Sequence, residues 1–353
     1  MKRIFLSLIM VMGLVVGLAG CTGVSYYAQT LKGHAQIMTK RQTVAKLIGD
    51  ASTPEALRER MASARAIRQF ATDELGLPDN SSYRSYVDIG RDYVTWAVFA
   101  APEFSLVPQV WCFPVFGCVP YRGYFSRDIA IKTAAGLQQQ GFDVHVSGVT
   151  AYSTLGWSSD PLLSTMFLQD KTYLAGLVFH ELAHQRVYLG DDTAFNEAFA
   201  VAVETTGVKS WLRAAGDASG LRRYEAGLRR SAEFLALVAQ TRGELSRVYQ
   251  GSGTVAQKRA AKVEAIDQLR IRYRQMRQSR WGGFRGYDAW VEAPINNAKI
   301  AATSVYNDRV PAFVRLFELC AGDYPRFYKA VGRLGRLAKA DRAAALETAK
   351  ACE

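Results

Sequence analysis

The HExxH motif at His180-Glu181-Leu182-Ala183-His184 constrains the fold of this chain more than any other feature of its sequence. Residues four apart share one face of an α-helix, so His180 and His184 can bind one metal ion, with the carboxylate of Glu181 near its open coordination position. No proline or glycine interrupts residues 177–189, and most neighbours of the histidines are apolar. The competing interpretation is a core helix with two hydrogen-bonded histidines. The pattern favours a zinc hydrolase site with Glu181 as the general base.

A catalytic zinc ion usually has three protein ligands, so a third ligand is expected downstream of the motif. Glu197 is the main candidate, because it lies in an apolar, helix-like segment, residues 195–204, where a carboxylate without a cation would be costly. Glu204 lies seven residues further on, on the same helix face, and is a candidate to orient a ligand histidine by a hydrogen bond. Asp191 and Asp192 remain alternatives for the third ligand.

The N-terminus carries the features of a bacterial lipoprotein signal. Lys2 and Arg3 precede an apolar run, residues 4–18, and the signal ends in the sequence LAGC, whose last residue is Cys21. The mature chain would begin at this cysteine, and its acyl chains would anchor the protein in a membrane. Thr22 follows the cysteine, which by the usual sorting rule favours the outer membrane, facing the periplasm. The competing interpretation is a cleaved signal peptide without lipidation.

Four cysteines remain after Cys21, and an even number in an oxidising compartment favours disulfides. Of the three possible pairings, we expect Cys112 with Cys118 and Cys320 with Cys352. The first pair would close a tight loop, and the second would tie down the C-terminal tail.

The HExxH motif, followed by a helix that carries Asn196-Glu197, resembles the gluzincin metallopeptidases, whose third zinc ligand is a glutamate. The interval from His184 to Glu197 is shorter than in thermolysin-like and alanyl-aminopeptidase-like members. Over its whole mature length the chain resembles a bacterial family of predicted lipoprotein aminopeptidases, and this resemblance implies zinc-dependent release of N-terminal residues. The segments that carry it are Cys21 with Tyr26-Tyr27, residues 111–125, the HELAH box, residues 195–200 and residues 295–298.

Apolar periodicity and the order of elements predict an α+β fold that is mainly helical. Strands are expected within residues 83–111 and 142–152, with a helix at about 127–140 between them; a strand, helix, strand and HExxH helix follow one another in zincin peptidases. Helices are also expected over residues 27–48 and 53–75. We expect a zincin-like small sheet with an HExxH active-site helix, and the following division: a signal peptide over residues 1–20, a catalytic region over 21–215 and a helical region over 216–353 packed on it.

Residues 221–280 carry 14 Lys and Arg against 5 Asp and Glu. Apolar residues recur there at intervals of three and four, and Gly251-Ser252-Gly253 separates two runs, so this segment predicts a long antiparallel helical hairpin. Nucleic acid is not expected as a partner of an envelope protein, and a solvated arginine-rich face explains the charge.

Further site assignments rest on analogy with peptidases. Residues 152–157 would line a cleft beside an edge strand that binds substrate backbone. Tyr306, with Arg309 as second choice, would stabilise the oxyanion, and Asn296 or Asn297 would bind substrate. Three acids are candidates for binding the ammonium group of a substrate: Glu204, Asp160 and Asp192.

The expected function is therefore that of a zinc metallopeptidase, with Zn²⁺ as cofactor, a peptide as substrate and a membrane contact through its lipid. Two alternatives stay open. One is a catalytically inactive zincin-fold lipoprotein that acts as an envelope scaffold, although metal binding alone would not need Glu181. The other is a zinc amidase acting on a peptidoglycan peptide.

Overall fold

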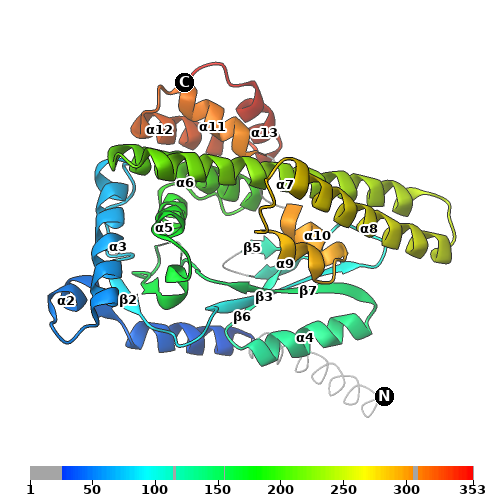
Figure 1. Ribbon diagram of the computed structural model, residues 1–353, viewed down its shortest axis with the longest axis horizontal. Coiled ribbons are helices and arrows are strands. Elements are labelled where there is room, and N and C mark those ends of the chain that lie inside the picture. Colours follow the sequence, from blue (N-terminus) through cyan, green and yellow to red (C-terminus); the bar gives the residue numbers. More distant parts are fainter. Residues whose placement is uncertain (1–25, 114–116, 155, 305–308, 353) are drawn as a thin grey trace, which may run out of the picture.

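The computed structural model describes residues 26–113, 117–154, 156–304 and 309–352. Within these ranges the chain is mainly helical, and its short strands form three small sheets, as expected for an α+β fold (Figure 1). The predicted lipidation site Cys21 and the predicted oxyanion residue Tyr306 lie outside the described residues.

The N-terminal part of the fold differs from the single helix expected over residues 27–48. Residues 26–39 form a helix, but the chain turns at Lys40. Thr43 then caps a second helix, because its hydroxyl accepts a hydrogen bond from the backbone N–H of Lys46. The expectation of one continuous helix is therefore wrong. The next elements are β1 (Gln42–Thr43), α2 (Val44–Gly49), α3 (Glu55–Asp73) and β2 (Ser85–Val87).

An antiparallel sheet lies near the middle of the molecule, with strands in the order β6-β3-β7 (Figure 1). Side chains alternate along its central strand, so Val98 and Ala100 pack against α4 (Arg127–Gln139) on one face. Phe99 belongs to the opposite face, which packs against α10 (Asn297–Ser304). A helix therefore covers each face of this sheet. Its strands are β3 (Thr95–Pro102), β6 (Arg122–Tyr124) and β7 (Phe142–Val149).

The remaining strands of the described chain form two smaller sheets. In one of them Cys112 lies opposite Cys118, and these residues form a disulfide. The other joins β1, β2 and β8, and leads into the 3-10 helix η1 (Ser164–Phe167). The remaining strands are β4 (Trp111–Phe113), β5 (Gly117–Val119) and β8 (Leu162–Leu163).

The largest hydrophobic core surrounds two helices that pack side by side, α5 (Lys171–Arg186) and α6 (Thr193–Ala214). Helix α3 packs on α5, and the C-terminal helices cover α6. A disulfide between Cys320 and Cys352 ties the end of the chain to this layer, so both expected cysteine pairings are confirmed. The C-terminal helices are α11 (Val310–Leu319), α12 (Tyr324–Gly335) and α13 (Lys339–Thr348).

The basic segment forms the long helical hairpin that its periodicity predicts. Helices α7 (Ala218–Gln250) and α8 (Val255–Ser279) pack against each other, and α9 (Asp288–Glu292) adds to their own hydrophobic core. Among the described residues, no helix combines the length and the apolar character needed to cross a bilayer.

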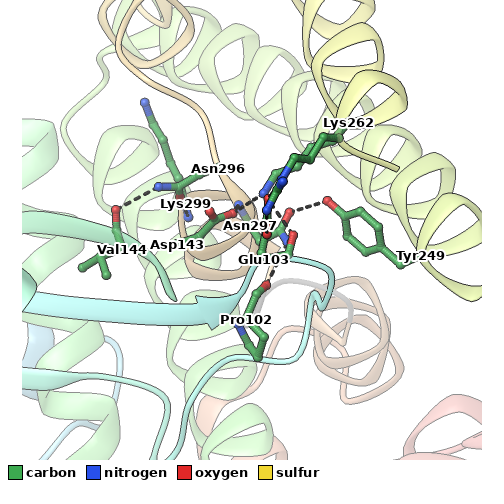
Figure 2. A network of polar contacts seen from close by, with 10 residues as sticks. Pro102, Glu103, Asp143, Val144, Tyr249, Lys262, Asn296, Asn297 and Lys299 are labelled. Atoms are coloured by element: carbon green, nitrogen blue, oxygen red, sulfur yellow. Dashed lines mark hydrogen bonds and ion pairs between the residues drawn. The ribbon is translucent and has the colours of Figure 1, made fainter. Parts of the chain in front are cut away.

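A polar network joins this hairpin to the central sheet (Figure 2). Lys262 of α8 forms an ion pair with Asp143 of β7 at 2.6 Å. Asn297 is fully buried; its side-chain amide donates hydrogen bonds to the carbonyls of Pro102 and Glu103, and its oxygen accepts one from Tyr249. These contacts place the start of α10 between the sheet and the hairpin.

Candidate metal centre

Helix α5 carries the HExxH motif. Asp170 caps its start by accepting a hydrogen bond from the backbone N–H of Tyr173, and the helix continues without interruption to Arg186. The four-residue spacing brings His180 and His184 together, with their Nε2 atoms 3.2 Å apart and their rings edge to face. Both Nε2 atoms therefore point at one place beside the helix.

Helix α6 brings Glu197 to the same place. Its start is fixed against the end of α5 by the buried side chain of Asn196, which donates a hydrogen bond to the carbonyl of Leu189 and accepts one from its backbone N–H. The Glu197 carboxylate then lies 3.4 Å from Nε2 of His180 and 3.8 Å from Nε2 of His184. One ligand atom from each of the three residues lies within 4.8 Å of the others.

The spacing of these three donors fits a zinc ion. Zinc ligands at distances of about 2.0–2.1 Å form a tetrahedron with edges of about 3.3 Å. The two Nε2 atoms are 3.2 Å apart and Oε2 of Glu197 lies 3.4 Å from Nε2 of His180, both close to that edge, whereas the oxygen of Glu197 nearest to His184 is Oε1, at 3.8 Å. Two imidazoles and one carboxylate are also a donor set of catalytic zinc sites, which keep the fourth position open.

Glu204 orients one of the histidines. Its Oε2 lies 3.1 Å from Nδ1 of His180, so this carboxylate can accept the Nδ1 proton and leave Nε2 free to bind a metal. Gly176, one turn before His180 on α5, makes the approach possible, because a Cβ atom there would lie 3.1 Å from Oε1 of Glu204.

Carboxylates set the electrostatics of the site. Burial alone would lower the pKa of His180, but hydrogen bonds to Glu197 and Glu204 raise it well above its usual value. The same field favours a bound cation. The pKa of His184 falls to about 4 because the ring is buried, so this ring is neutral and able to bind metal at neutral pH. Burial raises the pKa of Glu181 to about 7, although the neighbouring His180 lowers it.

The alternative third ligands lie elsewhere. Asp192 caps α6 by accepting a hydrogen bond from Phe195, and it pairs with Arg309 at 3.3 Å and with Arg342 at 3.6 Å. Asp191 pairs with Arg342 at 2.8 Å. Neither aspartate belongs to the cluster of ligand atoms. Arg309, the second choice for the oxyanion, has its guanidinium occupied by Asp192.

The third acid considered for an ammonium group, Asp160, holds a loop together. It is buried, and it accepts hydrogen bonds from the backbone N–H and the hydroxyl of Thr154 and from the hydroxyl of Ser158. In the same loop the hydroxyl of Tyr152 is within hydrogen-bonding distance of His34, and Trp157 is 84% exposed. All three acids thus have partners within the chain.

The two asparagines predicted to bind substrate form hydrogen bonds within the fold. Asn297 holds the polar network in Figure 2, and Asn296 donates a hydrogen bond to the carbonyl of Val144. Their amides are satisfied by the chain's own backbone and, for the oxygen of Asn297, by the hydroxyl of Tyr249. A substrate-binding role for either asparagine is therefore not supported.

Two tyrosines that sequence reasoning missed lie near the cluster. The ring of Tyr188 is edge-on to His184, with 6.1 Å between the ring centroids, and its pKa is raised by burial and by the charge of Glu197. Tyr121 follows the disulfide-closed hairpin, and burial together with Glu197 raises its pKa to about 12. Tyr188 lies four residues after His184, and this spacing could have indicated from the sequence that the two side chains are neighbours. The position of Tyr121 could not be predicted, because it depends on contacts between distant segments.

A third missed residue, Tyr83, has a left-handed backbone with φ of 62°, and its side chain is buried. Its backbone N–H donates to the carbonyl of Asp160, and burial and the charge of Glu181 raise its pKa well above the usual value. The preceding loop is tied down by the buried guanidinium of Arg68, which donates to the carbonyls of Pro78 and Ser82. Backbone strain of this kind occurs often at functional sites.

Comparison with known proteins gives one match. The model of a protein family described as "Putative aminopeptidase" matches residues 25–346. No curated protein and no solved structure matches the chain. Since the family model covers nearly the whole described chain, including α5 and α6, this protein belongs to the putative aminopeptidase family.

Proposed function

We propose that this chain is a zinc-dependent metallopeptidase that releases N-terminal residues from peptides in the cell envelope. One observation carries the proposal: the ligand atoms of His180, His184 and Glu197 converge within 4.8 Å of one another, beside the carboxylate of Glu181. Membership of the putative aminopeptidase family supports peptidase activity.

When bound at this site, zinc supplies a Lewis acid for the peptide carbonyl and lowers the pKa of water. Glu181 accepts a proton from the attacking water and then returns it to the leaving amine. Without a metal ion, burial raises the pKa of Glu181 to about 7, and general acid–base catalysis is most efficient when the pKa of the group lies near the working pH. Glu204 keeps the imidazole of His180 in one orientation through Nδ1.

Tyr188 is the proposed donor of a hydrogen bond to the oxyanion that forms during attack. Its ring borders His184, and it is partly exposed, as a group that meets substrate must be. Tyr306 remains a prediction for the same role.

The location in the envelope is inferred from the signal-like N-terminus, with acylation at Cys21. The two disulfides support an oxidising compartment, because such bonds persist there. Retention at the outer membrane, facing the periplasm, rests on the residue after Cys21.

A second candidate is a zinc amidase that cleaves a peptidoglycan peptide. The observation that favours it is the occupation of Glu204, Asp160 and Asp192 by partners within the chain, which leaves none of the three free for a substrate ammonium. A catalytically inactive scaffold is less well supported, because Glu181 is not needed to hold a metal.

The proposal is tested by measuring zinc content and hydrolysis together. Purified protein should hold one equivalent of zinc, and Glu197→Ala should lose most of it, whereas Glu318→Ala, a change at an exposed glutamate of α11, should not. Glu181→Gln should keep zinc and lose hydrolysis. Undiminished turnover by Glu181→Gln would refute the mechanism.

The substrate class is decided by paired peptides. Release of the first residue from free peptides, but not from N-acetylated copies, is expected of an aminopeptidase. Cleavage of both forms would indicate an endopeptidase, and cleavage of peptidoglycan peptides alone would favour the second candidate.

A further inference from the structure

The start of the described chain lies close to the predicted anchor. Four residues separate Cys21 from Tyr26, where the first helix begins. A fully extended chain spans at most about 3.5 Å per residue, so Tyr26 can be no more than about 17 Å from the acylated residue. The start of the helix over residues 26–39 must therefore lie near the membrane surface if Cys21 is acylated.

The inner face of this helix is fixed to the rest of the fold. The side chain of Gln29 accepts a hydrogen bond from the backbone N–H of Phe125. Gly33 lies against the ring of Phe125 so closely that a Cβ atom there would be 2.2 Å from the ring. Ile37 is buried in the main core. Residues 29, 33 and 37 thus form one stripe that faces the protein.

The outer face carries apolar side chains that no part of the described protein covers. Leu31 is 69% exposed and lies about 200° around the helix from both Gln29 and Gly33. Ala28 and Ala35, one turn before and one turn after it, are also exposed, and Lys32 lies beside them. Residues 26–39 contain no acidic residue. We call Ala28, Leu31, Lys32 and Ala35 the outer face of the helix.

The residues around the start of the helix have the chemistry of a membrane interface. The ring of Tyr26 stacks on Phe113 at 5.1 Å, and the guanidinium of Arg122 lies 4.6 Å from the centroid of the same ring. Tyrosine and arginine are both suited to the headgroup region, where one part of a side chain is apolar and the other is wet. Helix α4 lies along the same side of the molecule (Figure 1).

We propose that the helix over residues 26–39 lies flat on the membrane, with its outer face in the headgroup region of anionic phospholipids. This inference rests on the proposed acylation of Cys21 but not on the proposed peptidase activity. An apolar stripe with a flanking lysine is the pattern of a helix that lies in the interface plane. The contact would hold the catalytic region in one orientation, with the C-terminal helices on the side of the molecule away from the bilayer (Figure 1).

The test places a fluorescent probe on the outer face of the full acylated protein. Since Cys112, Cys118, Cys320 and Cys352 form disulfides, a new cysteine provides a free thiol for labelling. Leu31→Cys and, as a second position, Ala35→Cys are labelled and reconstituted into vesicles of phosphatidylcholine and phosphatidylglycerol that carry a quencher at the headgroup level. Leu337→Cys, an exposed position next to α12, is the matched control.

Quenching several-fold stronger at residues 31 and 35 than at residue 337 is expected, and adding Lys32→Glu should weaken it. Equal quenching at all three positions, in acylated protein, would overturn the membrane contact. A probe at residue 31 that is shielded from water but not quenched would instead indicate a protein partner, and would also overturn it. Absence of acylation, seen by mass spectrometry, would overturn the anchor and this contact together, and would leave the peptidase proposal untouched.

Discussion

Glu204 lies 3.1 Å from Nδ1 of His180, although 24 positions separate them in the chain. The contact joins α6 to α5 and directs Nε2 of His180 toward Glu197. It has the form of the carboxylate–histidine pairs that orient metal ligands in zinc sites. The same helix, α6, thus supplies both the predicted third ligand and the group that orients the first.

Glu204→Ala should lower zinc affinity by about 10- to 100-fold, because such outer carboxylates typically contribute that much to metal binding. The fold should be kept, since Glu204 is partly exposed and its removal leaves only the Nδ1 atom to be satisfied by water. Competition with a chelator of known affinity measures the effect, with Glu318→Ala as control. Unchanged affinity would remove Glu204 from the site.

Gly176→Ala provides a gentler test of the same contact. The new methyl group would lie 3.1 Å from Oε1 and 3.3 Å from Cγ of Glu204, so the carboxylate must move by a few tenths of an ångström. Gly136 of α4 is the matched control, because a Cβ atom there meets nothing within 4 Å.

Replacing glycine by alanine within a helix stabilises a protein by up to about 1 kcal/mol when there is space. We therefore expect Gly136→Ala to raise the free energy of unfolding, and Gly176→Ala to gain less and to bind zinc more weakly. Equal gains with unchanged zinc affinity would contradict the crowding at Gly176. Denaturant titration and chelator competition on the two variants decide the matter.

The ionised carboxylate of Glu181 should lower the free energy of unfolding of the zinc-free protein at neutral pH. Its pKa is raised from 4.5 to about 7 by burial, so in this window the folded chain retains a proton that the unfolded chain releases. Stability contributed by the protonated carboxyl is present below pH 4.5 and is lost as the pH rises through 7.

Glu181→Gln should therefore stabilise the zinc-free protein at pH 8 by roughly 1–3 kcal/mol, since one pKa unit corresponds to about 1.4 kcal/mol. The gain should vanish below pH 4.5. Denaturant unfolding of both proteins at the two pH values measures it. A gain that is the same at both pH values would show that charge is not its cause.

Features that depend on local spacing were predictable from the sequence. The long hairpin and the pairing of Cys112 with Cys118 follow from short-range patterns, and both are present in the structure. Glu197 was found because an unpaired carboxylate in an apolar helix needs a cation, and it lies beside His180 and His184. In this case the cost of burying one unpaired carboxylate was enough to identify the candidate ligand from the sequence.

Features that depend on contacts between distant segments were not predictable. Asn296, Asn297 and Asp160 look in sequence like surface or site residues, yet their partners are backbone groups and hydroxyls supplied by the fold. The break near Lys40 was missed because the apolar pattern continues across it, whereas the chain turns at Lys40 and Thr43 caps the start of a second helix. A polar side chain can form hydrogen bonds with a substrate or with the backbone, and only the fold determines which of these partners it has.

Tyr188→Phe should lower kcat by about 10²- to 10³-fold if its hydroxyl stabilises the oxyanion, as removal of one such donor does in other hydrolases. KM and zinc content should change little, because the ring and its contact with His184 are kept. Tyr93→Phe, at another partly exposed tyrosine, is the control. Full activity in Tyr188→Phe would return the role to Tyr306.

Asn297→Ala should destabilise the whole fold without changing the zinc content. The substitution removes three hydrogen bonds at a fully buried position and leaves the hydroxyl of Tyr249 without its acceptor, whereas the carbonyls of Pro102 and Glu103 keep the backbone N–H of Ser105 and the ammonium of Lys262 as donors. Each lost hydrogen bond costs about 1 kcal/mol and the unsatisfied hydroxyl adds about 1 kcal/mol or more, so a total loss of roughly 3 kcal/mol is expected. Tyr249→Phe removes a single hydrogen bond and should cost only about 1 kcal/mol. If Asn297→Ala instead kept full stability and raised KM, the asparagine would be a substrate-binding residue after all, and the network in Figure 2 would not be what joins the hairpin to the sheet.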